Sequence, residues 1–200
     1  MNLALFDFDG TITNKDTFTA FVRFVTSPQR KVIGYVSLAP FILGYKAGVV
    51  SATRMRQLMV RVALSGMKTK KYHELGQIYC RRFLHTWLRK NALERIKWHL
   101  SSGDKVVIVS ASLDGYLAPW CKSLGVELIC SCLESKNDKL TGRYIEGDCT
   151  SSEKMRRILS SYSLDQFDKV YAYGDTQEDN EMLSLAHESY YQWVKQMTEK

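Results

Sequence analysis

Short apolar runs alternate with stretches of helical spacing at the start of the chain and again beyond residue 90. Each run is about five residues long, and most lead into glycine, serine or an acidic residue, which is typical of a buried strand that ends in a loop. The stretches between them repeat apolar residues every three or four positions and predict helices. The predicted strands cover residues 2–6, 105–109, 126–131 and 169–173, with a weaker one at 190–194; the predicted helices cover 93–100, 116–124, 152–159 and 178–185.

This alternation predicts an α/β fold with a Rossmann-like, largely parallel sheet, whose ligands bind beyond the C-terminal ends of the strands. Residues 16–90 interrupt the pattern, because they contain helical runs and no convincing strand. We therefore expect a catalytic core of residues 1–15 and 91–200, with residues 16–90 inserted as an all-helical cap over the strand ends. The helical runs of this insertion cover residues 17–25, 52–64 and 70–88. Turn residues within 135–143 predict a small β flap.

The stretch 32–45 carries no charge and lies between Arg30/Lys31 and Lys46. Spanning a bilayer takes roughly 20 apolar residues, so this stretch is too short to cross one. Two interpretations stay open: a buried helical hairpin kinked near Pro40, or an element that dips into a lipid surface.

Charge divides the chain in the same way. Residues 16–90 contain 14 Lys and Arg but only two acids, Asp16 and Glu74, whereas the remainder has 14 basic and 19 acidic residues. Such a basic segment indicates an anionic partner, for which phosphate, a lipid headgroup or nucleic acid would serve, or a solvated helix face. No nucleic-acid-binding motif accompanies the charge, so we expect no nucleic-acid partner.

The five cysteines are scattered and have no zinc-site spacing. Together with an N-terminus that lacks the pattern of a secretory signal, they predict reduced thiols in a cytoplasmic protein.

Two acidic loops follow predicted strands. Asp7 and Asp9 stand in the sequence DFDGT directly after the first strand, and Asp175 and Asp179 follow the strand at 169–173. Carboxylates placed so closely repel one another unless a cation or a proton lies among them. Oxygen ligands from two such loops are what Mg²⁺ requires.

The second predicted strand ends at Val109 and is followed by Ser110-Ala111-Ser112. Free backbone N–H groups at such a strand-to-helix junction bind anions, and a hydroxyl adds a donor. We expect Ser110 to bind phosphate and Ser112 to cap the next helix. Lys154 opens a later helix and by itself would be a solvated lysine.

DFDGT, a serine at a strand end, a distant lysine and GDxxxD, in this order, resemble the haloacid dehalogenase superfamily of phosphohydrolases. The helical insertion after the first motif resembles subfamily IB, which includes phosphoserine phosphatase and the phosphatidylglycerophosphatase C type, and implies a cap of the C1 type. The sequences DKLTG at 138–142 and YAYGD before the last motif add to this likeness.

The resemblance implies roles for individual residues. Asp7 would be the nucleophile that forms an aspartyl-phosphate, and Asp9 the general acid and base. Mg²⁺ would be bound by Asp7, by the backbone carbonyl of Asp9 and by Asp175, with Asp179 anchoring the metal's water or Lys154. The transferring phosphate would be held by Ser110, the N–H of Ala111, Lys154 and the close approach of the Gly10 backbone.

The sequence constrains the leaving group of the substrate less than it constrains the reaction. Asp16 and Arg61 resemble the acid and the arginine with which phosphoserine phosphatase grips its substrate, but aspartate is shorter than the glutamate found there. We expect a small phosphorylated metabolite as the substrate. The alternatives are phosphoserine, or a lipid phosphate with its acyl chains near residues 38–43 and peripheral contact with an anionic membrane. A mutase or phosphotransferase that uses the same intermediate, and a basic module without catalysis, also stay open, and the sequence sets no oligomeric state.

Overall fold

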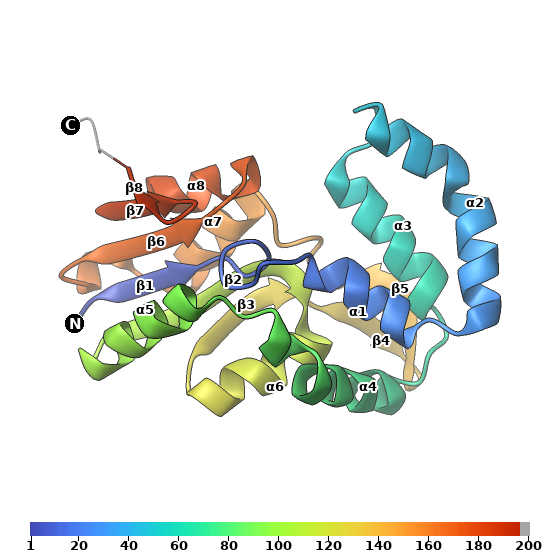
Figure 1. The fold of residues 1–200 in the computed structure, drawn as a ribbon, viewed down its shortest axis with the longest axis horizontal. Helices are drawn as coiled ribbons and strands as arrows, with labels where there is room; N and C mark the ends of the chain where they lie inside the picture. The colour runs from blue at the N-terminus through green and yellow to red at the C-terminus, as the bar shows by residue number, and fades with distance from the viewer. Residues whose placement is uncertain (197–200) are drawn as a thin grey trace.

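The computed structural model describes residues 1–196, and a six-stranded sheet forms its centre (Figure 1). The strand order is β3-β2-β1-β6-β7-β8, and within this sheet β8 alone is antiparallel to its neighbour. The strands are β1 (Leu3–Phe6), β2 (Lys105–Leu113), β3 (Glu127–Ser131), β6 (Val170–Gly174), β7 (Glu188–Tyr191) and β8 (Val194–Lys195). The α/β class with a mostly parallel sheet is thus confirmed.

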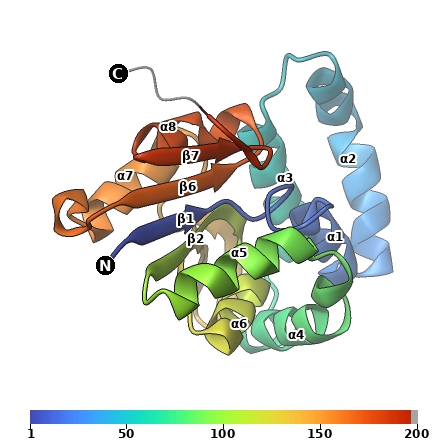
Figure 2. The same ribbon diagram turned by 60° about the vertical axis from the view of Figure 1, so that its left-hand side comes forward.

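Alternating side chains divide the core between the two faces of the sheet. Phe6 and Ile108 belong to one buried cluster, while Leu5 and Val107 belong to the other. The first cluster packs under α5 (Lys90–Ser101) and α6 (Asp114–Leu124), and the second packs under α7 (Ser152–Ser161) and α8 (Asn180–Ser184), as Figure 2 shows. Because helices cover both faces of the sheet, the central strands are continuous apolar runs in the sequence.

Four helices lie between β1 and α5 and extend beyond the strand ends (Figure 1). They are α1 (Thr17–Val25), α2 (Pro28–Lys46), α3 (Ala52–Leu64) and α4 (Thr69–Arg82). The bounds of α1 and α3 equal the predicted ones, whereas the predicted helix 70–88 ends at Arg82 and is followed by a short 3-10 helix, Leu84–Thr86. The exact division into core and cap stays a prediction.

Helix α4 joins this helical region firmly to the core. A Cβ at Gly76 would lie only 1.9 Å from the carbonyl oxygen of Gly115 in α6, so the absence of a side chain allows the two helices to touch. The hydroxyl of Tyr72 donates to Asp114 at 2.8 Å across the same contact. Helices α1, α2 and α3 therefore extend from a fixed base.

The prediction of a buried hairpin kinked near Pro40 is wrong. Residues 32–45 belong to α2, a single helix that continues through Pro40, and Leu38 is its one buried residue. Most of its other large apolar side chains face solvent; Val36, for example, is 73% exposed. No helix among the described residues combines the length and the apolar character needed to span a membrane.

Two hairpins complete the fold. The predicted flap is formed by β4 (Leu133–Lys136) and β5 (Lys139–Tyr144), which pair antiparallel. The weak strand expected at 190–194 is instead the end of β7, a tight turn and the start of β8. Gln192 and Trp193 form this turn with positive φ angles of 50° and 67°, which a continuous strand does not allow.

Candidate active site

The register of the central strands brings the two acidic loops together. β1 pairs with β6 so that Phe6 lies opposite Tyr173, and the Asp7 N–H donates to the Tyr173 carbonyl at 2.9 Å. One carboxylate oxygen from each of Asp7, Asp175 and Asp179 lies within 4.8 Å of the other two. Residues that are more than 160 positions apart in the chain thus form one cluster at the C-terminal rim of the sheet.

Lys154 lies within this cluster. Its Nζ donates to Asp7 Oδ1 at 2.5 Å and to Asp179 Oδ1 at 2.6 Å, and the residue is 2% exposed. Lys154 is therefore not the solvated lysine that its position in the sequence would suggest by itself. Burial would lower the pKa of Lys154, but Asp7 and Asp179 raise it above the ordinary value, so the ammonium stays charged.

The nucleophile candidate is itself strongly perturbed. Burial raises the pKa of Asp7 well above its ordinary range, the Lys154 ammonium opposes this effect, and the Asp179 carboxylate adds to it. Burial and then Asp179 also raise the pKa of Asp175. A further positive charge among these groups would relieve the repulsion.

Gly10 gives Asp175 the space it needs. Its φ of +89° is in the left-handed region, and a Cβ there would lie 2.0 Å from Asp175 Oδ2. The neighbouring Thr11 hydroxyl donates to Asp175 Oδ1 at 3.2 Å. The DFDGT loop therefore helps to fix the position of the second acidic loop.

Asp179 organises the second loop. One of its oxygens binds Lys154, and the other accepts the backbone N–H groups of Asp175 at 3.0 Å and Thr176 at 3.1 Å. Asp179 thus links Lys154 to the backbone of the second acidic loop.

Asp9 faces away from these carboxylates, toward the N-terminal end of α1. Its Oδ1 accepts the N–H and the hydroxyl of Thr17 at 2.8 and 2.5 Å, and its Oδ2 accepts the hydroxyl of Ser112. Burial raises the pKa of Asp9 to about 6, although the hydrogen bonds from Ser112 and Thr17 oppose the shift. The side chain of Asp9 is therefore separate from the Asp7–Asp175–Asp179 group.

The contacts of Asp9 correct one prediction and add two residues. Ser112 belongs to β2, and the residue at the cap position of α6 is Leu113, which makes no side-chain hydrogen bond there. Ser112 is therefore no helix cap; it binds Asp9. Thr17 was not predicted as a site residue, because a threonine at the start of a helix does not indicate a hydrogen bond to a residue eight positions earlier.

Ser110 and Ala111 lie in the last part of β2, the strand next to β1, and line the same cavity as Asp7. The expectation that this strand ends before Ser110 is therefore wrong. Ser110 is buried, and its Oγ accepts the Ser112 N–H at 3.0 Å. The predicted anion site thus adjoins the carboxylate cluster.

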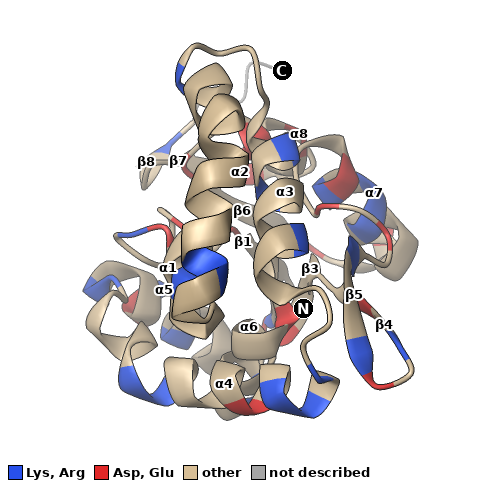
Figure 3. Cartoon of the chain, turned by 90° about the vertical axis from the view of Figure 1, so that its right-hand side faces the viewer, with Lys and Arg blue, Asp and Glu red and all other residues tan. Residues whose placement is uncertain are grey.

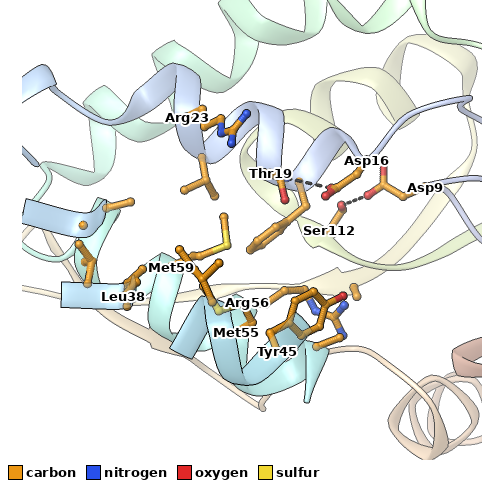
Figure 4. A pocket seen from close by; sticks show the side chains of 18 of the residues that line it. Asp9, Asp16, Thr19, Arg23, Leu38, Tyr45, Met55, Arg56, Met59 and Ser112 are labelled. Carbon is orange, nitrogen blue, oxygen red and sulfur yellow. Dashed lines mark hydrogen bonds between the residues drawn. The ribbon is translucent and has the colours of Figure 1, made fainter. Parts of the chain in front are cut away.

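A cavity of about 540 Å³ opens above these residues, between the sheet and helices α1, α2 and α3 (Figure 4). Its floor includes Asp7, Asp9, Lys154 and Asp179. Its upper wall is largely apolar, with Leu38, Met55 and Met59 among the side chains drawn in Figure 4.

Comparison with known proteins agrees with this architecture. A family model described as haloacid dehalogenase-like hydrolase matches residues 4–184. The chain belongs to this family. Protein CicA of Caulobacter vibrioides (strain NA1000 / CB15N) is 32% identical over 195 residues, covering 94% of this chain and 85% of CicA.

Two further proteins resemble this haloacid dehalogenase-like hydrolase along nearly its whole length. A histidinol-phosphatase of Neisseria meningitidis serogroup C (strain 8013) is 23% identical over 205 residues, covering 94% of this chain and 88% of that protein. A solved phospho-aspartyl intermediate analogue of phosphoserine phosphatase superposes with a TM-score of 0.66 at 21% identity, covering 94% of this chain and 85% of the other. The latter likeness shows a shared fold, as the predicted resemblance to subfamily IB requires.

The carboxylate cluster of this hydrolase fits a hard divalent cation. Three buried or half-buried carboxylates offer oxygen atoms within 4.8 Å of one another. One oxygen of Asp7 and one of Asp179 bind Lys154, which leaves the second oxygen of Asp7 and the carboxylate of Asp175 for a metal. The donor chemistry thus suits Mg²⁺.

The two residues expected to select the leaving group behave differently. Asp16 lines the cavity but also caps α1, since its Oδ1 accepts the Thr19 N–H at 2.9 Å. Arg61 is exposed and does not line the cavity, and a Cβ at Gly142 of the flap would lie 3.0 Å from its Cα. Its contact with substrate stays a prediction. The periodicity of α3 places Arg61 on the helix face that lies against the flap.

Arg56 is the cavity arginine of α3 that the sequence analysis missed. Its Nε donates to Asp148 at 2.6 Å and its Nη2 to Glu178 at 3.1 Å. Asp148 lies within the core, so these ion pairs link α3 to it. Both partners are distant in sequence, and no local pattern marks them.

Proposed function

We propose that this haloacid dehalogenase-like hydrolase is a phosphatase that cleaves phosphomonoesters through an aspartyl-phosphate on Asp7. The observation that carries the proposal is the buried ion pair of Asp7 with Lys154, on the floor of an open cavity and beside Asp175. A structural salt bridge does not need a third carboxylate and a cavity. The phosphatase names of two of the similar proteins add support.

In the first step an oxygen of Asp7 attacks phosphorus, and the bond from phosphorus to the leaving oxygen breaks. Asp9 gives its proton to that oxygen, and a carboxyl pKa of about 6 allows this exchange near neutrality. In the second step the Asp9 carboxylate takes a proton from water, whose oxygen attacks phosphorus. Inorganic phosphate leaves, and the Asp7 carboxylate and the Asp9 acid are restored.

Mg²⁺ would be held by Asp7, the backbone carbonyl of Asp9 and Asp175, with Asp179 behind them. When bound, it offsets the repulsion between a carboxylate nucleophile and a phosphate dianion. Lys154 supplies a fixed positive charge beside Asp7. Asp179 keeps that ammonium in position through its 2.6 Å contact.

The phosphate oxygens would be bound by the Ser110 hydroxyl, the Ala111 N–H and the Lys154 ammonium. All three residues line the cavity next to Asp7. Such preorganised donors stabilise the charge that develops during phosphoryl transfer. Gly10, without a side chain, leaves room for Asp175 and would let the loop backbone approach the phosphate.

Release of phosphate from a panel of phosphomonoesters with Mg²⁺ tests this function. We expect turnover by the wild type and none by Asp7→Asn, which should still fold. Equal activity of the two proteins would contradict the proposal. Added alcohols distinguish the mutase and phosphotransferase alternatives, since those activities transfer the phosphoryl group to the alcohol instead of to water.

Phosphoserine is one of the substrate alternatives, and its carboxylate would need a cationic partner. Arg61 lies outside the cavity and Arg56 is bound by two acids, whereas Arg23 of α1 lines the cavity and would be the arginine for this role. A small phosphorylated metabolite without a carboxylate beside the phosphate needs no such partner.

We also propose peripheral contact with an anionic membrane through the outer side of α2. A helix that is apolar on all sides is normally buried, yet Val32, Ile33 and Val36 are each more than 60% exposed. Figure 3 shows that the middle turns of α2 carry no charge, and Arg30, Lys31 and Lys46 stand at its ends. An interfacial helix with basic flanks has this pattern. Five free cysteines suit a reducing compartment, so we place this contact on the cytoplasmic side.

Sedimentation with vesicles tests the membrane contact. We expect binding to vesicles of phosphatidylcholine with phosphatidylglycerol at low salt, and loss of binding when Val32 and Val36 are both replaced by Asp. Absence of wild-type binding, or equal binding by this variant, would contradict it.

A further inference from the structure

The cavity has two ends of different chemistry. The floor carries the carboxylates and Lys154, whereas the opposite end, which we call the lid end, is formed by apolar side chains of α1, α2 and α3. These side chains are Phe18, Val22, Leu38, Ile42, Met55 and Met59. A small, polar leaving group would leave such a surface in contact with water, at an energetic cost.

Three of the polar side chains that line the cavity beside the lid end are already occupied by the protein, while Arg23, Lys31, Tyr35 and Tyr45 line the cavity as well. Arg30 donates through Nη1 to the carbonyls of Ala63 and Ser65 at 3.1 and 2.6 Å. The Thr26 hydroxyl binds the Val22 carbonyl within its own helix, and Arg56 is bound by Asp148 and Glu178. These groups therefore have few hydrogen bonds to offer the polar atoms of a leaving group.

The composition of the lid end indicates the shape of its ligand. Met55 and Met59 are unbranched and adapt to varied apolar shapes, and both line the cavity together with Leu38 of α2 (Figure 4). About 540 Å³ is within the range of pockets that enclose a sizeable ligand. Phosphate alone fills only the floor.

We infer that the lid end is a binding site for the apolar chain of an amphiphilic phosphomonoester, such as a long alkyl or acyl phosphate ester. This inference rests on the proposed function, because the phosphate group of the ligand has to lie at Asp7 while its chain extends between α1, α2 and α3. It names the class of substrate and assigns Leu38, Ile42 and Met59 a role in specificity.

Binding of alkylphosphonates measures this site without turnover, because a C–P bond replaces the ester link. Methyl-, butyl-, hexyl- and octylphosphonate are titrated into the wild-type protein with Mg²⁺ by calorimetry, below their micelle concentrations. We expect the affinity to rise about fourfold for each methylene that is buried, until the lid end is full. Equal affinity along the series, or no binding of any member, overturns the inference.

A matched pair of variants locates the chain. Leu38→Asn changes the lid end, and Leu159→Asn makes the same change at an exposed position of α7 outside the cavity. We expect Leu38→Asn to remove most of the advantage of octyl- over butylphosphonate, and Leu159→Asn to keep it. Equal behaviour of the two variants overturns the inference; Ile42→Asn replaces Leu38→Asn if the latter does not fold.

Phosphate release separates this inference from the proposed function. If the protein releases phosphate from short phosphomonoesters but gains nothing from longer chains, the apolar site is wrong and the phosphatase stands. If chain length strengthens binding but no phosphomonoester is hydrolysed, the site is right and the proposed function is wrong.

Discussion

The Nζ of Lys154 lies 2.5 Å from Asp7 Oδ1, in a contact between residues 147 positions apart. The contact is buried, and a second carboxylate, Asp179, shares the same ammonium. Lys154 therefore compensates two buried negative charges at once, and both its catalytic and its structural effects can be measured.

Lys154→Met should impair both catalysis and stability. Loss of the charge beside the phosphate is expected to lower kcat by about 10²- to 10³-fold. The Asp7 and Asp179 carboxylates lose their partner, which should lower the free energy of unfolding by about 3 kcal/mol in the absence of metal. Phosphate release and urea unfolding measure the two effects.

Lys122→Met is the control for this experiment, because Lys122 is exposed on α6. A Lys154→Met protein that matched this control in both assays would show that the buried ion pair contributes to neither.

Asp9→Asn should distinguish substrates by their leaving groups. An alkoxide needs the proton of Asp9, so kcat/KM for an alkyl phosphate is expected to fall about 10²- to 10⁴-fold. p-Nitrophenolate leaves without that proton, so its phosphate ester should lose far less. An equal loss for both esters would exclude Asp9 as the general acid.

Removal of divalent metal with EDTA should abolish turnover, and Mg²⁺ should restore it. Because a cation relieves repulsion among Asp7, Asp175 and Asp179, Mg²⁺ is also expected to raise the melting temperature. Asp175→Asn should lose most of this rise, whereas Asp165→Asn, at a position remote from the cluster, should keep it. A rise of equal size in both variants would place the metal elsewhere.

Folding stability should decrease below pH 6.5 because of His99. This buried ring binds Asp104 at 2.8 Å and Tyr173 at 2.9 Å, and burial lowers its pKa below the ordinary value of 6.5. The unfolded chain then takes up the proton first, so stability is present above pH 6.5 and decreases as the pH falls through it.

His99→Gln removes that proton site. The free energy of unfolding, measured in urea from pH 7.5 to pH 5, should slope less steeply in this variant than in the wild type. Parallel curves would assign the pH dependence to other groups.

The parts of the site that follow strands could be predicted from the sequence. Asp7 and Asp175 come directly after buried apolar runs, and parallel strands deliver their ends to one rim. The contacts of Asp9 with Ser112 and of Arg56 with Asp148 could not, since each joins segments about 100 positions apart. Ser112 looked like a helix cap because a serine before a helix has the same local sequence in either role.

The exposure of helix α2 could not be predicted from the sequence either. Its uncharged sequence is typical of buried structure, so burial was one of two interpretations, and only the packing of α2 against α3 reveals that its outer side is left exposed. Arg61 and Arg56 differ by five positions on α3, and the faces on which they lie depend on that packing too.

Trapping the covalent intermediate tests the central claim most directly. The protein is quenched during turnover of a phosphomonoester with Mg²⁺ and treated with borohydride, which reduces an acyl phosphate to the alcohol, and its peptides are analysed by mass spectrometry. We predict that Asp7 alone is converted to homoserine, and only when substrate was present. Conversion of Asp9 or Asp175 instead, or an unmodified Asp7 in protein that was releasing phosphate, would contradict the mechanism.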